Sequence, residues 1–328
     1  MEPRLSIIIP FYNVEQYIAQ CLDSVYNQDI PEEEYEVICV NDASPDNSRE
    51  IVKEYQKKHK NLILVEHEVN KKLGAARNTG RSVAKGKYIW NVDSDDMIAP
   101  NCLKEMLEIC EKNELDVLLF GCKRLHNDQL YERKEAPWDE SLLLTTGLMF
   151  WKEQGIKKQG QISAVWTQIY RRDYLDNNHI FSPEINMGED VPYTYSSILH
   201  AKCIKAINTP YYIYRDNSES LTGALRKHPN PKAIYENSFV CSAYLFSLIK
   251  QIPSDEQLVI NAFYAVTRHI VLLFPYHGNL LSPEERKILL SLCRRHFVKN
   301  LFVYKVLTSR QAFKYTKYII TGILPEKC

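Results

Sequence analysis

Acidic side chains that could bind a cation stand close together at residues 93–96, where Asp93, Asp95 and Asp96 flank Ser94. Carboxylates this close repel one another unless a cation or hydrogen-bond donors compensate their charge. A hard divalent ion such as Mg²⁺ or Mn²⁺ prefers oxygen ligands and commonly bridges a carboxylate to diphosphate oxygens. The segment therefore indicates metal-assisted chemistry on a phosphate-bearing substrate, and a solvated acidic turn is the alternative.

Further charged residues could complete such a site. Arg77 lies at the start of a predicted helix, where free N–H groups and a cation would suit a phosphate, although an ordinary solvated arginine fits equally well. Asp42, and the pair Glu189 and Asp190, read by themselves as turn or helix-cap residues. A reaction that uses a cation for its leaving group also needs a separate carboxylate to deprotonate the attacking hydroxyl, and Asp190 is the best-placed candidate.

Alternating strand and helix patterns must position these residues. Apolar runs predict strands at residues 5–10, 35–41, 62–66, 88–91 and 116–122, and amphipathic patterns predict helices at 14–27, 48–58, 74–84 and 101–113. This order is typical of an α/β fold with a mostly parallel sheet flanked by helices. Ligands of such sheets bind outside the carboxyl ends of the strands. Residues 11–13, 41–44 and 93–96 follow three of the strands and should meet at one edge.

The second part of the chain is less regular. Strands are predicted at 203–207 and 211–214, in a region interpreted as the acceptor side, and a helix at 191–199. From about residue 232 the pattern is helical, with helices predicted at 232–250, 255–274, 283–297 and 299–320. Two prolines at residues 229 and 231 interrupt both periods. We therefore predict a catalytic domain at 1–228 and a helical C-terminal region at 229–328.

Composition excludes some classes of protein. The chain has 328 residues, and 41 basic residues balance 41 acidic ones, so no overall field favours nucleic acid as a partner. Nine cysteines without a C-x-x-C pair favour a reducing, cytoplasmic setting. Because no stretch approaches the ~18 apolar residues of a membrane-spanning helix, an integral membrane protein is not expected.

The C-terminal region nevertheless has a local charge asymmetry. Residues 286–325 contain nine Lys and Arg residues, no Asp or Glu, and interleaved aromatic and aliphatic residues. Such a surface is typical of peripheral contact with an anionic membrane, which would present a membrane-borne acceptor. A dimerisation or core-capping helix with a solvated basic face is an equal alternative.

Seven motifs in order resemble family 2 of the GT-A glycosyltransferases, which are inverting enzymes that use nucleotide sugars. These are residues 6–13 (SIIIPFYN), 40–48 (VNDASPDNS), 74–80 (GAARNTG), 84–88 (AKGKY), 93–96 (DSDD), 188–190 (GED) and 211–215 (YYIYR). The resemblance covers about residues 5–221. It implies a Rossmann-like GT-A fold, a UDP-linked sugar donor, a glycan or lipid-linked glycan acceptor, and Mn²⁺ or Mg²⁺ as cofactor.

The resemblance also implies a role for each candidate residue. On the donor side, Pro10, Phe11 and Asn13 would frame the base, Asp42 would accept a hydrogen bond from the uracil or ribose, and Asp93 and Ser94 would lie near the ribose. Arg77 would lie near the phosphates, and Asp95 with Asp93 would bind the metal, supported by Asp96. Asp190 would be the catalytic base with Glu189 beside it, and Arg215 would reach toward the diphosphate or acceptor.

Two features qualify the resemblance. Relatives often carry Lys where this chain has Gln168, and the Q-x-x-R-W signature of processive synthases is missing, which favours addition of a single sugar. A nucleotidyltransferase acting on sugar phosphates, and an inactive relative that binds a nucleotide or glycan, are the alternatives. The aromatic residues Trp138, Trp151, Trp166 and Tyr170 could stack on sugar rings, but their type favours a place in the core.

Overall fold

The computed structural model describes residues 2–217 except 133–136, 142–143, 159–161 and 186–187, and beyond them residues 237, 240, 241, 244, 245, 247–260, 262 and 263. The chain divides into two compact units, Met1–Glu184 with Tyr193–Ser220, and Ile185–Pro192 with Leu221–Cys328. In the segments 232–250 and 255–274, where helices are predicted, the described residues are helical at 237, 240–241, 244–245, 247–249, 257–260 and 262–263. The predicted boundary at 228/229, the helices at 283–297 and 299–320, and the basic tail lie outside the described residues.

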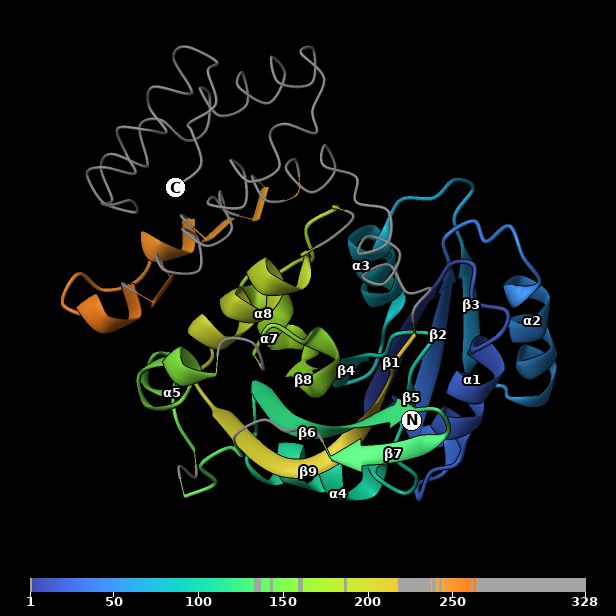
Figure 1. Ribbon diagram of the computed structural model, residues 1–328, viewed down its shortest axis with the longest axis horizontal. Helices are drawn as coiled ribbons and strands as arrows, with labels where there is room; N and C mark the ends of the chain where they lie inside the picture. Colours follow the sequence, from blue (N-terminus) through green and yellow to red (C-terminus); the bar gives the residue numbers. More distant parts are fainter. Residues whose placement is uncertain are drawn as a thin grey trace, which may run out of the picture. The chain divides into compact units, whose positions relative to one another are not determined.

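The first half of the sheet is parallel, as predicted. Its strands are β1 (Leu5–Phe11), β2 (Tyr35–Asn41), β3 (Leu62–Glu66) and β4 (Tyr88–Asn91), in the spatial order β3-β2-β1-β4. Helices α1 (Ile18–Tyr26) and α2 (Ser48–Lys58) lie together on one face, and α3 (Leu73–Val83) lies on the other (Figure 1). β1 and β2 are buried along their whole length because both faces are covered.

Glycine permits the close contact of α3 with this sheet. A Cβ at Gly80 would lie 2.4 Å from the side chain of Ile8 and 3.2 Å from that of Val40. Real carbon atoms do not approach so closely, so any larger residue would push the helix away from β1 and β2. The sheet and the C-terminal half of α3 are thereby held at a short, defined distance.

The second half of the sheet is mixed. β8 (Gln168–Arg171) lies between β4 and β6 (Val117–His126) and is antiparallel to both, whereas β9 (Ile204–Arg215) is parallel to β6. β5 (Met97–Ile98) pairs with β9, and β7 (Gln129–Glu132) pairs with β6. The other described elements are α4 (Leu103–Lys112), α5 (Gly147–Glu153), α7 (Arg172–Asn177), α8 (Asp190–Leu199) and the 3-10 helices η1 (Glu32–Glu34), η2 (Gly155–Lys157) and η3 (Val165–Thr167).

Two features of this half differ from the sequence-based expectations. The strand predicted at 116–122 extends the sheet as β6, but β8 lies between it and β4, and β8 was not predicted because its four residues are too few to show a period. The strands predicted at 203–207 and 211–214 form the single strand β9. Pro210 lies within this strand, and the register between β6 and β9 shifts at Gly121, opposite the proline, so the irregularity accommodates a residue that has no N–H to donate.

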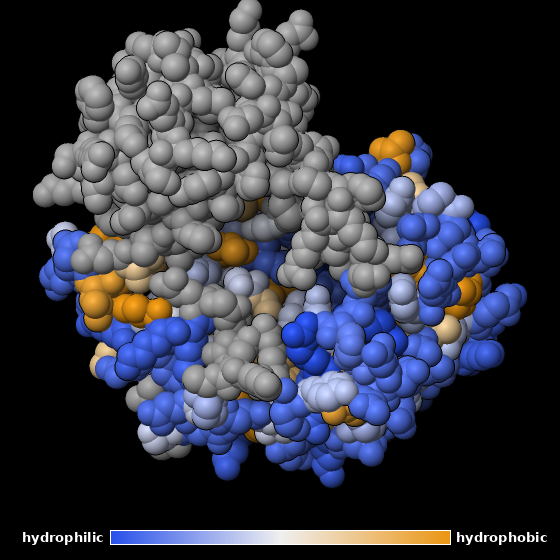
Figure 2. Space-filling model, viewed as in Figure 1, coloured by the Kyte–Doolittle hydropathy of each residue, from blue (hydrophilic) through white to orange (hydrophobic). Residues whose placement is uncertain are grey.

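The aromatic residues proposed for the core are indeed buried. Trp138, Trp151, Trp166 and Tyr170 are at most 8% exposed, which favours a packing role over stacking on a sugar. By contrast, the surface over α1 and α2 is mainly hydrophilic (Figure 2). Within the part of the chain that the structure describes, none of the helices combines the length and the apolar character needed to cross a bilayer.

Candidate functional site

The pairing of β1, β2 and β4 brings their carboxyl ends to the same edge. Phe11 pairs with Asn41, and Ile8 pairs with Asn91. The backbone continues this alignment past the strands, since the N–H of Asp42 donates to the carbonyl of Phe11 at 3.0 Å. The register therefore places the polar segments 11–13, 41–44 and 93–96 where the strand-end rule predicts them.

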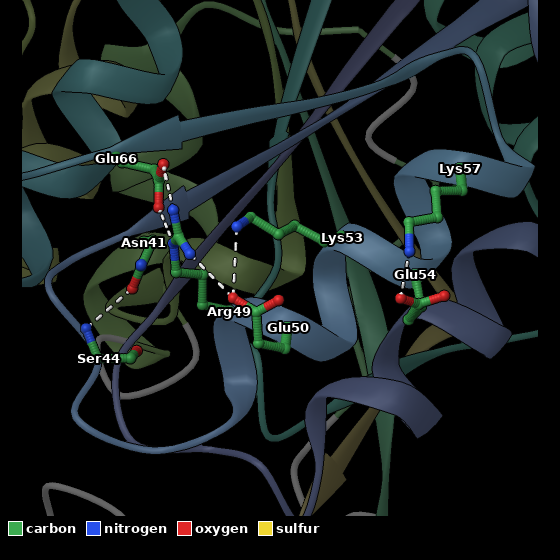
Figure 3. A network of polar contacts seen from close by, with 8 residues as sticks. All are labelled: Asn41, Ser44, Arg49, Glu50, Lys53, Glu54, Lys57 and Glu66. Carbon is green, nitrogen blue, oxygen red and sulfur yellow. Dashed lines mark hydrogen bonds and ion pairs between the residues drawn. The ribbon is translucent and has the colours of Figure 1, made fainter.

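The loops after β1 and β2 are joined by side chains. Asn13, which has a φ of 56°, donates its N–H to Ser44 Oγ at 3.3 Å, and Ser44 N–H donates to Asn41 Oδ1 at 2.9 Å (Figure 3). On the neighbouring surface, Arg49 of α2 pairs with Glu66 at the end of β3, and this hydrogen bond lowers the pKa of Glu66 (Figure 3). Pro10 and Phe11 remain buried within β1.

The carboxylate of Asp42 is enclosed by hydrogen-bond donors. Its Oδ1 accepts from His67 Nδ1 at 2.8 Å and from the N–H of Lys71 at 2.7 Å, and its Oδ2 accepts from the N–H of Lys72 at 2.9 Å. Lys72 has φ 80° and ψ 162°, which a residue with a Cβ rarely adopts. The loop before α3 thus keeps an unfavourable backbone conformation that directs two successive N–H groups at Asp42.

Helix α3 carries the arginine of the candidate site. Arg77 is 3% exposed, and its Nη2 donates to Asp93 Oδ1 at 2.9 Å. The same helix binds the segment near residue 182, because Asn78 donates to the carbonyl of Ser182 at 2.8 Å and accepts from its N–H at 2.9 Å. A Cβ at Gly74 would lie 2.0 Å from the carbonyl oxygen of Pro183. The motif at 74–80 therefore combines an arginine for the acidic segment with close packing against residues 182–183.

A buried tyrosine organises the acidic segment at 93–96. The Tyr212 hydroxyl donates to Asp96 Oδ2 at 2.8 Å and accepts from the N–H of Asp93 at 3.1 Å. Asp96 is 2% exposed, and its Oδ1 also accepts from the N–H of Arg215 at 2.7 Å. Burial, together with the charges of Asp95 and Asp93, raises the pKa of Asp96 well above its ordinary value.

Asp95 lies in the same segment, between the buried residues Ser94 and Asp96. It is half-buried, and its Oδ2 accepts from Asn217 Nδ2 at 3.0 Å. Burial and the neighbouring charge of Asp93 raise its pKa. A buried carboxylate beside another carboxylate is stabilised in its charged form by an added cation.

Arg215 contacts the acidic segment from β9. Its Nε donates to the backbone carbonyl of Asp95 at 3.0 Å, and its Nη2 donates to Gln20 Oε1 at 2.5 Å. The guanidinium carbon lies 5.4 Å from the centre of the Tyr17 ring. In this conformation the side chain braces the segment, and a direct contact of Arg215 with a diphosphate or acceptor remains a prediction.

Glu189 and Asp190 belong to the second compact unit. Glu189 is 4% exposed, and Asp190 is half-buried in the first turn of α8. Gly188, which precedes them with a φ of 80°, accepts a hydrogen bond from Cys241 Sγ at 3.1 Å. The structure describes this pair within its own unit, so its role toward residues 42 and 93–96 stays a prediction.

A match to the model of a protein family decides the classification. The model described as Glycosyl transferase family 2 matches residues 6–177, more than half of the 328 residues. The chain belongs to this family. This family 2 chain is 35% identical over 225 residues to the uncharacterized glycosyltransferase EpsJ of Bacillus subtilis (strain 168), with 68% of this chain and 64% of EpsJ covered.

A second family 2 relative is the poly(ribitol-phosphate) beta-N-acetylglucosaminyltransferase TarS of Staphylococcus aureus (strain MW2). The identity is 31% over 240 residues, which cover 71% of this chain and 39% of TarS. The chain therefore spans less than two thirds of the length of either relative. A crystal structure of S. aureus TarS 1-349 in complex with UDP-GlcNAc aligns with a TM-score of 0.71 and 24% identity, covering 97% of this chain and 87% of that one. This likeness shows that the family 2 chain has the GT-A fold.

The acidic segment has the donor chemistry of a site for a hard cation, because its side chains supply only oxygen atoms, three carboxylates and one hydroxyl. Burial first, and the charges of the neighbouring carboxylates second, raise the pKa of Asp95 and of Asp96. Among the described residues, no group of three or more His, Cys, Asp and Glu side chains could hold a metal ion. A cation bound by one or two carboxylates and by substrate phosphates is a common arrangement for Mg²⁺.

Sequence reasoning missed three residues that contact the candidate carboxylates: His67, Tyr212 and Asn217. His67 directly follows β3, so the strand-end rule applied to that strand would have found it. Tyr212 and Asn217 reach the acidic segment through the pairing of β5 with β9, over more than 110 residues of sequence. No local pattern reports such a contact.

Proposed function

We propose that this family 2 chain is an inverting glycosyltransferase that moves one sugar from a nucleotide-diphosphate donor, a UDP-sugar, to a hydroxyl of a glycan or lipid-linked glycan. The observation that carries the proposal is the shared strand-end edge, which brings Asp42 and the acidic segment 93–96 together beside Arg77. The structures of TarS with UDP and with UDP-GlcNAc, which have the same fold, support the choice of a uridine donor.

The donor side follows from the contacts at this edge. Pro10, Phe11 and Asn13 would frame the base beside Asp42, and Asp93 and Ser94 would contact the ribose. Arg77 lies against Asp93 and would stay near the phosphates. Asp95, with Asp93, would hold Mn²⁺ or Mg²⁺ against the diphosphate. When bound, this ion would stabilise the negative charge that develops on the departing nucleoside diphosphate.

Asp190 would act as the base. It would take the proton of the acceptor hydroxyl while that oxygen attacks the anomeric carbon from the face opposite the diphosphate, so that the configuration inverts. Glu189 would orient Asp190 or contact acceptor hydroxyls. Gln168 stands where relatives often carry Lys, and it brings no charge to this position, because its neutral amide donates to the carbonyl of Ile162. The nearby Arg171 and Arg172 do not supply this charge, since Arg171 pairs with Asp116 and Arg172 donates to the carbonyl of Gly86.

The acceptor belongs to the chemistry of cell-envelope polymers. A relative in Bacillus spizizenii is 34% identical over 227 residues, which cover 34% of its length, and it is named poly(ribitol-phosphate) beta-glucosyltransferase. TarS is likewise named poly(ribitol-phosphate) beta-N-acetylglucosaminyltransferase. Their names support an acceptor with repeated hydroxyl groups. A cytoplasmic location, at the inner face of the membrane if the basic tail binds lipid, is part of the same proposal.

Product analysis tests the reaction class. Incubation with UDP-, GDP- and dTDP-sugars, with and without Mn²⁺, should release a nucleoside diphosphate from the UDP-sugar in a Mn²⁺-dependent way. Release of pyrophosphate in a second incubation, with UTP and a sugar 1-phosphate in place of the UDP-sugar, would instead indicate nucleotidyl transfer, and binding without turnover would indicate an inactive relative. Retention of the donor's anomeric configuration in the product, measured by NMR, would contradict the inverting role of Asp190.

The proposed base makes the first prediction. Asp190→Asn should lower the transfer rate by about 10²- to 10⁴-fold while the donor dissociation constant stays nearly unchanged, because a base acts in the transition state. Asp173→Asn is the matched control, since Asp173 also lies in the first turn of a helix, α7, and should leave transfer normal. If donor affinity falls as much as the rate, Asp190 is a binding residue.

A further inference from the structure

Hydrogen-bond counting at Asp42 limits what a ligand can add there. A carboxylate offers about four acceptor positions, two on each oxygen. His67 Nδ1 and Lys71 N–H occupy Oδ1, and Lys72 N–H occupies one position on Oδ2. The contacts within the described part of the chain thus leave a single position, on Oδ2. The side chain of Asp42 is only 5% exposed, which also allows no more than a narrow approach.

The ring of His67 is held in place from both sides. Its Nδ1 faces Asp42, and its Nε2 lies 2.9 Å from Thr79 Oγ1 in α3. The His67 side chain is 4% exposed, so water does not compete freely for either nitrogen. Because a carboxylate oxygen can only accept, Nδ1 carries the proton and donates. The hydroxyl of Thr79 in α3 thereby fixes the ring that supplies a donor to Oδ1.

We propose that His67 determines base specificity: by filling Oδ1, it restricts Asp42 to one hydrogen bond from the donor nucleobase. Uracil presents a single N–H between two carbonyl groups, which matches the one remaining position. Guanine presents a ring N–H beside an amino group, and this pair requires both oxygens of one carboxylate. His67 therefore excludes the paired contact with guanine. The inference rests on the proposed function to the extent that Asp42 faces the donor base.

Two substitutions distinguish the contributions of the two ring nitrogens of His67. His67→Asn puts an amide N–H near the place of Nδ1 and keeps the donor to Asp42, whereas His67→Gln reaches toward Thr79 and loses that donor. His59→Gln is the matched control, because His59 Nδ1 also lies 2.8 Å from a carboxylate, that of Glu32. Isothermal titration with UDP and with GDP, at one Mn²⁺ concentration, gives the affinity ratio of the two nucleotides for each variant.

The expected result is a change in this ratio. The wild-type chain and His67→Asn should prefer UDP, and in His67→Gln the UDP:GDP affinity ratio should fall by about tenfold, the size of one hydrogen bond to a charged group. His59→Gln should keep the wild-type ratio. Thr79→Val gives a second route, since it releases the outer nitrogen of the ring and should lower the ratio by a smaller factor.

A ratio that is the same in His67→Gln, Thr79→Val and the wild type overturns the inference, as does equal affinity of the wild type for both nucleotides. Equal loss of both nucleotides, in a variant whose circular dichroism shows a native fold, also overturns it, because His67 would then act only in general binding. The titrations contain no sugar and measure no turnover. Failure of the proposed transfer reaction would therefore be seen separately.

Discussion

The two acidic strand ends of this site compensate their charge in opposite ways. Asp42, after β2, receives donors from His67, Lys71 and Lys72. The segment after β4 instead places carboxylates next to one another, and burial together with the charge of Asp93 raises the pKa of Asp95. The first site is completed by the fold, whereas the second is left with an excess of negative charge.

The difference assigns different ligands to the two ends. A carboxylate that the protein already surrounds with donors can add a directed hydrogen bond, as base recognition requires. Crowded carboxylates gain most from a cation, because the cation removes the repulsion between them. Arg77 supplies one guanidinium, and it contacts Asp93. The comparison predicts that the metal acts at the second end and that nucleotide recognition at the first end does not depend on it.

Among changes at the two strand ends, the largest expected effect comes from the crowded end. Asp95→Asn should lower Mn²⁺-dependent turnover by about 10²-fold or more while the fold stays intact, because Asp95 is half-buried and lies at a strand end outside the core. In the absence of metal, the affinity of this variant for UDP should stay within about threefold of the wild type, because nucleotide recognition is expected at Asp42.

Asp42→Asn should behave in the opposite way. It should weaken UDP binding at every Mn²⁺ concentration but leave the concentration of Mn²⁺ that gives half-maximal activity unchanged. Titrations of nucleotide at several metal concentrations measure both quantities. Near-normal turnover of Asp95→Asn with Mn²⁺, or loss of the metal dependence in Asp42→Asn, would break the comparison.

A smaller effect is expected at the hydroxyl that organises the crowded end. Tyr212→Phe removes one bond to Asp96 and one from the N–H of Asp93, which should cost about 1–3 kcal/mol of unfolding free energy. Mn²⁺ affinity should fall several-fold because the segment loses its brace. Tyr174→Phe is the control, since it also removes a buried hydroxyl, one that donates to the carbonyl of Ser197. Equal Mn²⁺ affinity in both variants would deny Tyr212 this role.

The parallel half of the fold could be predicted from sequence because its signals are local. The predicted bounds of β2, α2, β3 and β4 coincide with the structure, since continuous apolar strands and amphipathic helices alternate there. The strand-end rule then placed Asp42 and residues 93–96 at one edge. β8 and the brace at Tyr212 depend on pairings between distant residues, which no local period encodes. The resemblance alone supplied the role of Arg215, whereas the chemistry of the reaction had already suggested Asp190 as the base and the resemblance supported it.

The smallest expected effect is the pH dependence of the metal-free protein. Because the pKa of Asp95 is raised above its ordinary value of 3.8 in the folded chain, the folded state binds this proton more tightly than the unfolded state does. The contribution of Asp95 to stability is therefore fully present below 3.8 and is lost as the pH rises through the raised pKa. Asp95→Asn removes this loss, because an amide does not ionise.

The variant should accordingly be more stable than the wild type at about pH 7.5, and this difference should shrink toward about pH 5. Urea denaturation of both proteins at the two pH values, in the presence of a chelator, measures it. Saturating Mn²⁺ should abolish the advantage of the variant at the higher pH, because the ion compensates the same charge that the substitution removes. An advantage that persists in Mn²⁺ would mean that the cation does not bind at Asp95, and the two strand ends would no longer differ in the way their charges are compensated.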